Sequence, residues 1–111
     1  MVSPRRWLPL GGVSVALALA ASVAFAGAVF RVAQIGREFS VATLAIAAGD
    51  TVQFSNEDTF LHQIYAYSAA FSFDSDEQAP GETLAVRFPV AGTFEVHCHI
   101  HPKMRLVVTV R

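Results

Sequence analysis

The sequence predicts an all-β sandwich of about seven strands, preceded by an apolar N-terminal segment. After residue 27, no long stretch carries apolar residues at the three- and four-residue spacing of a helix face. Short runs of alternating or β-branched residues recur instead, and turn residues separate them at intervals of roughly ten. This pattern is typical of a Greek-key β-sandwich, and the 111 residues of the chain are enough for one such domain.

Residues 1–26 have the composition of an export signal peptide. Arg5 and Arg6 precede a long uncharged run, and Ala24-Phe25-Ala26 fits the small-x-small pattern that signal peptidases cleave. The uncharged run continues to Phe30, so an uncleaved membrane anchor is the alternative. In both cases we expect residues 27–111 to form the folded domain outside the cytoplasm, in the periplasm. Contact with a membrane is expected only if the segment stays uncleaved.

Turn residues divide residues 27–111 into the predicted strands. The first three are separated by Gly36-Arg37-Glu38 and by Ala48-Gly49-Asp50, where glycine gives the backbone the freedom that a tight reversal needs. A long, acidic, irregular stretch over 68–82 follows the fourth strand and ends in a Pro80-Gly81 turn. Val90-Ala91-Gly92 separates the next two strands. The predicted strands are 28–35, 43–47, 51–55, 62–67, 83–88, 93–98 and 106–110.

One nine-residue stretch, VHCHIHPKM, gathers most of the possible metal ligands. Cys98, the only cysteine, ends a predicted strand, and His101 and Met104 follow it at three-residue intervals, so one tight loop can present all three side chains. Pro102 stiffens that loop. The fourth histidine, His62, lies outside this stretch, in another apolar segment. A thiolate, two imidazoles and a thioether form the ligand set of a type 1, or blue, copper site, in which the methionine is the weak axial ligand.

The two other histidines of this stretch, His97 and His99, flank Cys98. Strand alternation places them on the opposite face from Cys98, so we expect them to face solvent beside Glu95. The alternative is that they bind a neighbouring copper cluster, as in multicopper oxidases. That cluster needs further His-x-His pairs, which the sequence lacks. We therefore expect a protein that is not an enzyme.

Asn56 is the candidate for a hydrogen bond to the copper-bound sulfur. It lies six residues before His62, at a strand end where its backbone could approach Cys98. Hydrogen bonds of this kind tune a metal site and restrain its ligands. Asn is also an ordinary turn residue, which needs no such role.

Three segments resemble the cupredoxins, specifically the plastocyanin and amicyanin branch. Residues 48–56, AGDTVQFSN, are similar to the strand that leads to the first histidine of that family. Pro80-Gly81-Glu82, Phe88 and Gly92-Thr93-Phe94 are similar to the region before its ligand loop. Residues 98–104, CHIHPKM, resemble the short ligand loop of amicyanins. The resemblance covers roughly residues 39–110.

This resemblance implies a cupredoxin-like Greek-key sandwich with one type 1 copper. The implied ligands are His62, Cys98, His101 and Met104, and the family's asparagine ahead of the first histidine supports Asn56. The implied function is single-electron transfer by Cu(I)/Cu(II) cycling with redox proteins, such as a periplasmic dehydrogenase or a c-type cytochrome. The alternative is copper delivery or buffering without electron transfer. We expect a monomer, and the net charge of −1 gives no support for a nucleic-acid partner.

Overall fold

The computed structural model describes residues 2–5, 11–14 and 27–111, and the folded part consists of nine β-strands. None of the described residues forms a helix of the length and apolarity needed to cross a membrane. Most of the predicted signal or anchor segment lies outside the described residues. The strands are β1 (Val29–Ile35), β2 (Glu38–Phe39), β3 (Thr43–Ile46), β4 (Thr51–Asn56), β5 (Ile64–Ala66), β6 (Phe73–Asp74), β7 (Thr83–Arg87), β8 (Gly92–Cys98) and β9 (Arg105–Val110).

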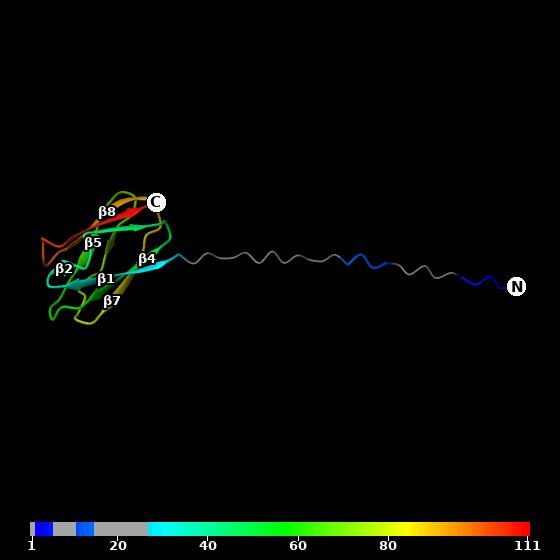
Figure 1. Ribbon diagram of the computed structural model, residues 1–111, viewed down its shortest axis with the longest axis horizontal. Coiled ribbons are helices and arrows are strands. Elements are labelled where there is room, and N and C mark those ends of the chain that lie inside the picture. The colour runs from blue at the N-terminus through cyan, green and yellow to red at the C-terminus, as the bar shows by residue number, and fades with distance from the viewer. Residues whose placement is uncertain (1, 6–10, 15–26) are drawn as a thin grey trace.

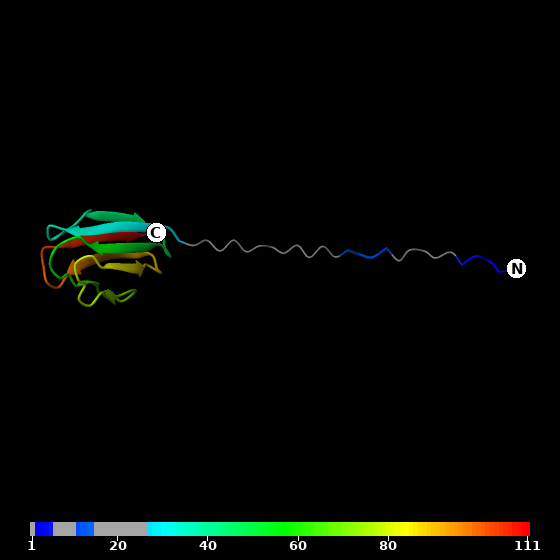
Figure 2. The ribbon, with the colours of Figure 1, turned by 90° about the horizontal axis from the view of Figure 1, so that it is seen from below.

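The strands form two mixed sheets that face each other as a sandwich. One sheet has the order β2-β1-β4-β7 and the other β3-β9-β8-β5-β6. The β1–β4 and β3–β9 pairs are parallel, while the remaining pairs are antiparallel. Figure 1 shows that the chain enters the sandwich at one end and that the loop between β8 and β9 lies at the opposite end, and Figure 2 shows the same from below. The predicted all-β sandwich is confirmed.

The seven predicted strands correspond to seven of the nine strands in the structure. The other two, β2 and β6, contain two residues each, which is too short for any alternation of side chains to be recognised. The fourth strand begins later than predicted, at Ile64, because His62 pairs only with Gln78 in an isolated bridge. That bridge brings the acidic stretch against the segment that carries His62.

The core lies between the inward faces of the two sheets, as strand alternation requires. Val52 and Phe54 of β4 are fully buried, and Phe94, Val96 and Cys98 of β8 follow the same pattern on the facing sheet. Cys98 is therefore the last inward-facing residue of a buried strand, at the end of the sandwich where the β8–β9 loop begins.

Candidate metal centre

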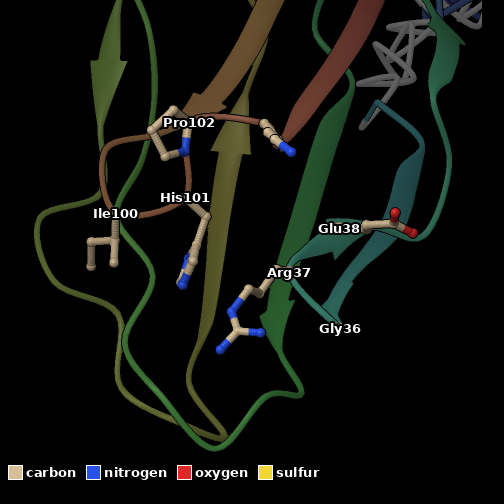
Figure 3. A pocket seen from close by; sticks show the side chains of 7 residues that line it. Gly36, Arg37, Glu38, Ile100, His101 and Pro102 are labelled. Atoms are coloured by element: carbon tan, nitrogen blue, oxygen red, sulfur yellow. The ribbon is translucent and has the colours of Figure 1, made fainter.

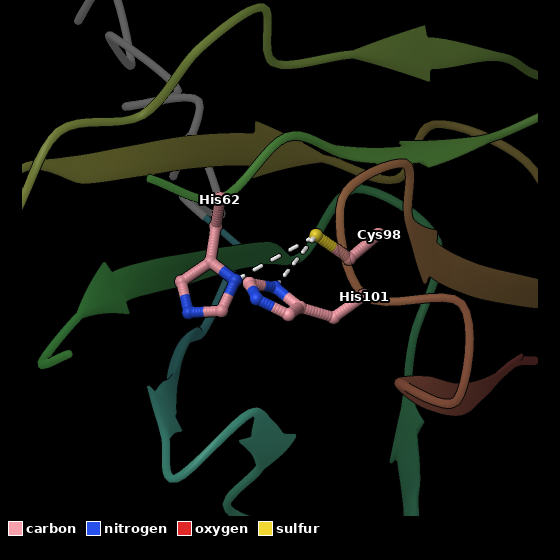
Figure 4. Close-up of side chains that lie close together, drawn as sticks. All are labelled: His62, Cys98 and His101. Carbon is pink, nitrogen blue, oxygen red and sulfur yellow. Dashed lines mark hydrogen bonds between the residues drawn. The ribbon is translucent and has the colours of Figure 1, made fainter. Parts of the chain in front are cut away.

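Three of the predicted ligands meet at the end of the sandwich beside the β8–β9 loop. Cys98 ends β8, His101 lies in the loop that follows, and His62 precedes β5. The Cys98 Sγ atom is 3.6 Å from Nδ1 of His62 and 3.9 Å from Nδ1 of His101. The ligating atoms of the three residues all lie within 4.8 Å of one another. Figure 4 shows both imidazole rings turned toward the sulfur.

Met104 closes the same loop, directly before β9. Its backbone N–H donates to the carbonyl oxygen of His101 at 3.0 Å, which turns the chain tightly between the two residues. The side chain of Met104 is 1% exposed and belongs to the core, whereas His101 is half-buried. The loop that follows Cys98 thus carries one partly exposed imidazole and one fully buried thioether.

The donor set and its surroundings fit a copper ion. One thiol and two imidazoles, with a buried thioether in the same loop, match the ligands of type 1 sites. Burial lowers the pKa of His101, and the neighbouring His62 and Arg37 lower it further. A lowered pKa keeps this imidazole neutral at neutral pH, which is the form that binds a metal.

The hydrogen bond to the Cys98 sulfur, predicted from Asn56, comes in the structure from Gln63. The backbone N–H of Gln63 donates to Sγ at 3.4 Å. Asn56 is nearly completely buried, but its own N–H donates to the carbonyl of Glu82. Gln63 directly follows His62 and pairs with the end of β8. Its N–H therefore lies opposite the sulfur, whereas Asn56 at the end of β4 does not.

Asn56 instead fastens the loop that leads to His62. Its side-chain amide donates to the carbonyl oxygens of Phe60 at 2.9 Å and of Gln78 at 3.0 Å, and its Oδ1 accepts from the N–H of Asp58 at 3.0 Å. Asn56 therefore fixes the conformation of the loop that leads to His62, and this is the structural role of the asparagine in the motif.

The Phe60 ring packs against both imidazoles. The ring of Phe60 lies 5.4 Å from that of His62 and 5.1 Å from that of His101, and the two imidazoles are 4.9 Å apart. The guanidinium of Arg37 lies over Phe60 at 4.8 Å. Beside His101, residues of the β1–β2 turn and of the β8–β9 loop line a recess of about 420 Å³, toward which His101 and Arg37 both extend (Figure 3).

Sequence reasoning missed Asp58, whose carboxylate contacts the far side of His62. Asp58 Oδ2 lies 2.8 Å from Nε2 of His62, and the Asp58 side chain is 8% exposed. Burial raises the pKa of Asp58, but hydrogen bonds from His62 and from the N–H groups of Gly36 and Arg37 outweigh it and lower the pKa. The only signal in the sequence was a carboxylate four residues before a histidine. That spacing alone does not predict the contact, because the two side chains meet only through the shape of the loop.

His97 and His99 lie away from the three-residue cluster, as strand alternation predicts. Nε2 of His97 pairs with Glu95 at 3.2 Å, and Nε2 of His99 pairs with Asp74 at 3.0 Å. The His99 ring also stacks on Tyr65 with a centroid distance of 3.8 Å. Both imidazoles therefore belong to the outer face of the β5–β6–β8 sheet.

The Asp74 network makes a testable contribution to acid stability. The Gln63 side chain is the largest cause that lowers the pKa of Asp74 to about 2, and contacts with Asp76, His99 and Tyr67 add to it. Because this pKa lies below the usual 3.8, the stabilisation is present above about pH 4 and is lost as the pH falls to 2. Between pH 4 and pH 2, the free energy of unfolding of the metal-free protein, measured in urea, should fall by about 1 kcal/mol more for wild type than for Asp74→Asn. Equal losses would contradict the contribution.

Comparisons with known proteins agree with this geometry. The family model for copper binding proteins of the plastocyanin/azurin family matches residues 28–111. The chain is 34% identical over 108 residues to the chloroplastic plastocyanin of Chlamydomonas reinhardtii, covering 87% of this chain and 74% of that protein. A reduced tryptophan-to-tyrosine mutant of amicyanin is 25% identical, with a TM-score of 0.69 over 77% of this chain and 83% of that one.

Two further solved structures share the fold over different extents. A purple cupredoxin from Nitrosopumilus maritimus has a TM-score of 0.65 at 22% identity, over 74% of this chain and 99% of that chain. A copper-containing nitrite reductase from Thermus scotoductus has a TM-score of 0.68 at 27% identity, over 74% of this chain. The chain spans only 22% of that reductase. The family model over residues 28–111 and the 34% identity to plastocyanin show that the chain belongs to the plastocyanin/azurin family of copper binding proteins, and the buried sulfur–imidazole cluster fits copper as its cofactor.

Proposed function

We propose that this protein carries single electrons between redox proteins in the periplasm, through one copper held by His62, Cys98, His101 and Met104. The observation that carries the proposal is the buried Cys98 sulfur with an imidazole nitrogen at 3.6 Å and another at 3.9 Å. Membership of the family supports copper-based electron transfer in general. The periplasmic location rests on the export pattern of residues 1–26, and an intact mass corresponding to residues 27–111 would support it, whereas an unprocessed mass would contradict cleavage.

The chain's contribution is to hold its ligands still. Copper supplies the one-electron Cu(I)/Cu(II) couple when bound. Cys98 pairs with Ile64 of β5 at the end of its strand, and His62 is held by backbone hydrogen bonds in both directions with Gln78, at 3.1 and 2.7 Å. Pro102 and the tight turn between His101 and Met104 restrain the remaining loop. Ligands fixed from several elements change position little when the charge of the site changes, which favours rapid electron transfer.

The partly exposed ring of His101 is the proposed route to a partner. Ile100 is 43% exposed and lines the recess beside His101 together with Pro102, so the rim is apolar at these two residues of the β8–β9 loop, while Arg37, Glu38 and Lys103 add charge to the rest of it. Small apolar contacts of this kind suit brief encounters between redox proteins. A periplasmic dehydrogenase as donor and a c-type cytochrome as acceptor are the partner classes that we propose.

Addition of one equivalent of Cu(II) to the purified domain tests the function. We expect an intense visible absorption band and reversible one-electron voltammetry, because a thiolate-bound copper held in a fixed site has both properties. Copper that exchanges readily and gives no stable coloured Cu(II) state would favour copper delivery or buffering instead. Absence of any copper binding would contradict both functions.

The Met104 thioether is proposed as the weak axial ligand, and its replacement should change the potential. Met104→Gln is expected to retain copper and to lower the reduction potential by at least about 59 mV, a tenfold change in the relative stability of the two oxidation states. An amide oxygen is a harder donor than a thioether and therefore favours Cu(II). Voltammetry of both proteins measures the difference, and an unaltered potential would show that Met104 is not the axial ligand.

A further inference from the structure

Asp58 forms the far side of the proposed metal site. The Nδ1 atom of His62 faces Cys98 Sγ at 3.6 Å, while its Nε2 atom lies 2.8 Å from Asp58 Oδ2. His62 is fully buried and the Asp58 side chain is 8% exposed, so little water competes for this contact. An ionised carboxylate can only accept hydrogen bonds, so Nε2 carries a proton, and Nδ1, which faces the sulfur, is the nitrogen left for the proposed copper.

The β1–β2 turn holds this carboxylate in place. Gly36 and Arg37 have φ values of 64° and 59°, the left-handed pair of a two-residue hairpin turn. In this conformation their N–H groups point to Asp58, and they donate to Oδ1 at 2.7 Å and to Oδ2 at 3.2 Å. Together with Asn56, which accepts from the Asp58 N–H, they fix both the position and the direction of the carboxylate.

These contacts place a negative charge one imidazole away from the metal site, in surroundings that screen it poorly. A carboxylate that accepts from the remote nitrogen of a ligating histidine fixes the tautomer and makes the ring a stronger donor. A stronger donor and a nearby negative charge both stabilise Cu(II) more than Cu(I), because Cu(II) has the larger charge. Both effects act in the same direction on the potential.

We propose that Asp58 is a positioning residue of the copper site: it fixes His62 as the Nε2–H tautomer and lowers the reduction potential of the site. This inference rests on the proposed function, since it concerns the same copper. It adds the β1–β2 turn, through Gly36 and Arg37, to the elements that determine the potential, although that turn contributes no ligand.

The test compares Asp58→Asn with wild type, since the amide has almost the same size and lacks the charge. We expect the affinity for Cu(II) to fall about tenfold or more. With unchanged Cu(I) affinity, a tenfold fall raises the potential by 59 mV. In the metal-free protein, nitrogen-15 NMR of His62 should show one Nε2–H tautomer in wild type and a mixture in the variant. The matched control is Asp76→Asn, which removes one charge from an exposed residue whose φ of 54° suits asparagine and should change neither property.

The outcomes separate this inference from the proposed function. If wild type forms no coloured Cu(II) site, the proposed function fails. If wild type is coloured but Asp58→Asn has the same potential, Cu(II) affinity and tautomer, only the role of Asp58 is overturned. An equal shift in Asp76→Asn would overturn it too, because net charge alone would then explain the change. If Asp58→Asn does not fold, the NMR spectrum of metal-free wild type still tests the proposal, because a His62 that is not mainly the Nε2–H tautomer contradicts it.

Discussion

Replacement of Cys98 by serine is expected to abolish the intense visible absorption of the Cu(II)-loaded protein. The band requires a thiolate bound to copper, and a serine hydroxyl stays protonated at neutral pH, so it replaces the sulfur neither as an anion nor as a soft donor. The domain should still fold, because serine is smaller than cysteine and the N–H of Gln63 that donates to Sγ can donate to the hydroxyl instead. Spectra at one equivalent of Cu(II), with circular dichroism of the same samples, measure both expectations.

The matched control for this experiment is the next residue along the chain. His99→Gln removes an imidazole that pairs with Asp74 on the outer face of the sheet, so the visible band should remain. A band that persists in Cys98→Ser would contradict thiolate ligation and with it the proposed electron carrier. A band lost equally in both variants would mean that the outer imidazole takes part in the coloured site.

The parts of this molecule that follow from local sequence were predictable. Alternation over β4 and β8 identifies Phe54 and Cys98 as inward-facing, because the side-chain period of a strand is two residues wherever it occurs. The three-residue spacing from Cys98 to His101 and to Met104 requires only that a short loop follows a strand. Those features depend on neighbours in sequence, so the local sequence is sufficient to predict them.

The parts that depend on loops meeting in space were not predictable. Asp58 acquires its role because the β1–β2 turn and the loop before His62 come together, and no periodicity encodes that meeting. The donor to the sulfur was assigned to Asn56 from its place at a strand end, whereas pairing of β5 with β8 presents Gln63 to it. The motif around Asn56 was recognised, but its hydrogen-bond partners required the structure.

Gln78 also acts through contacts between segments that are distant in sequence. Its replacement is expected to cause a larger loss of stability than any other substitution proposed for this protein. Its side-chain amide donates to the carbonyl oxygens of Phe54 at 2.9 Å and of Glu82 at 2.8 Å, and its Oε1 accepts from Gln34 at 2.7 Å. Gln78 is 3% exposed and Gln34 is fully buried, so Gln78→Ala would leave buried polar groups without partners. Each such group costs about 1–3 kcal/mol, which predicts a loss of about 3 kcal/mol or more.

The loss should also reach the metal site, because the backbone of Gln78 holds that of His62 in both directions. Urea unfolding of metal-free Gln78→Ala measures the stability, and a copper titration of the same variant should show weaker binding than wild type, since part of the binding free energy would be used to reorder the site. Glu77→Ala, at the exposed neighbouring position, is the matched control and should remain within about 0.5 kcal/mol of wild type. Equal stability of the two variants would show that the buried amide does not support His62.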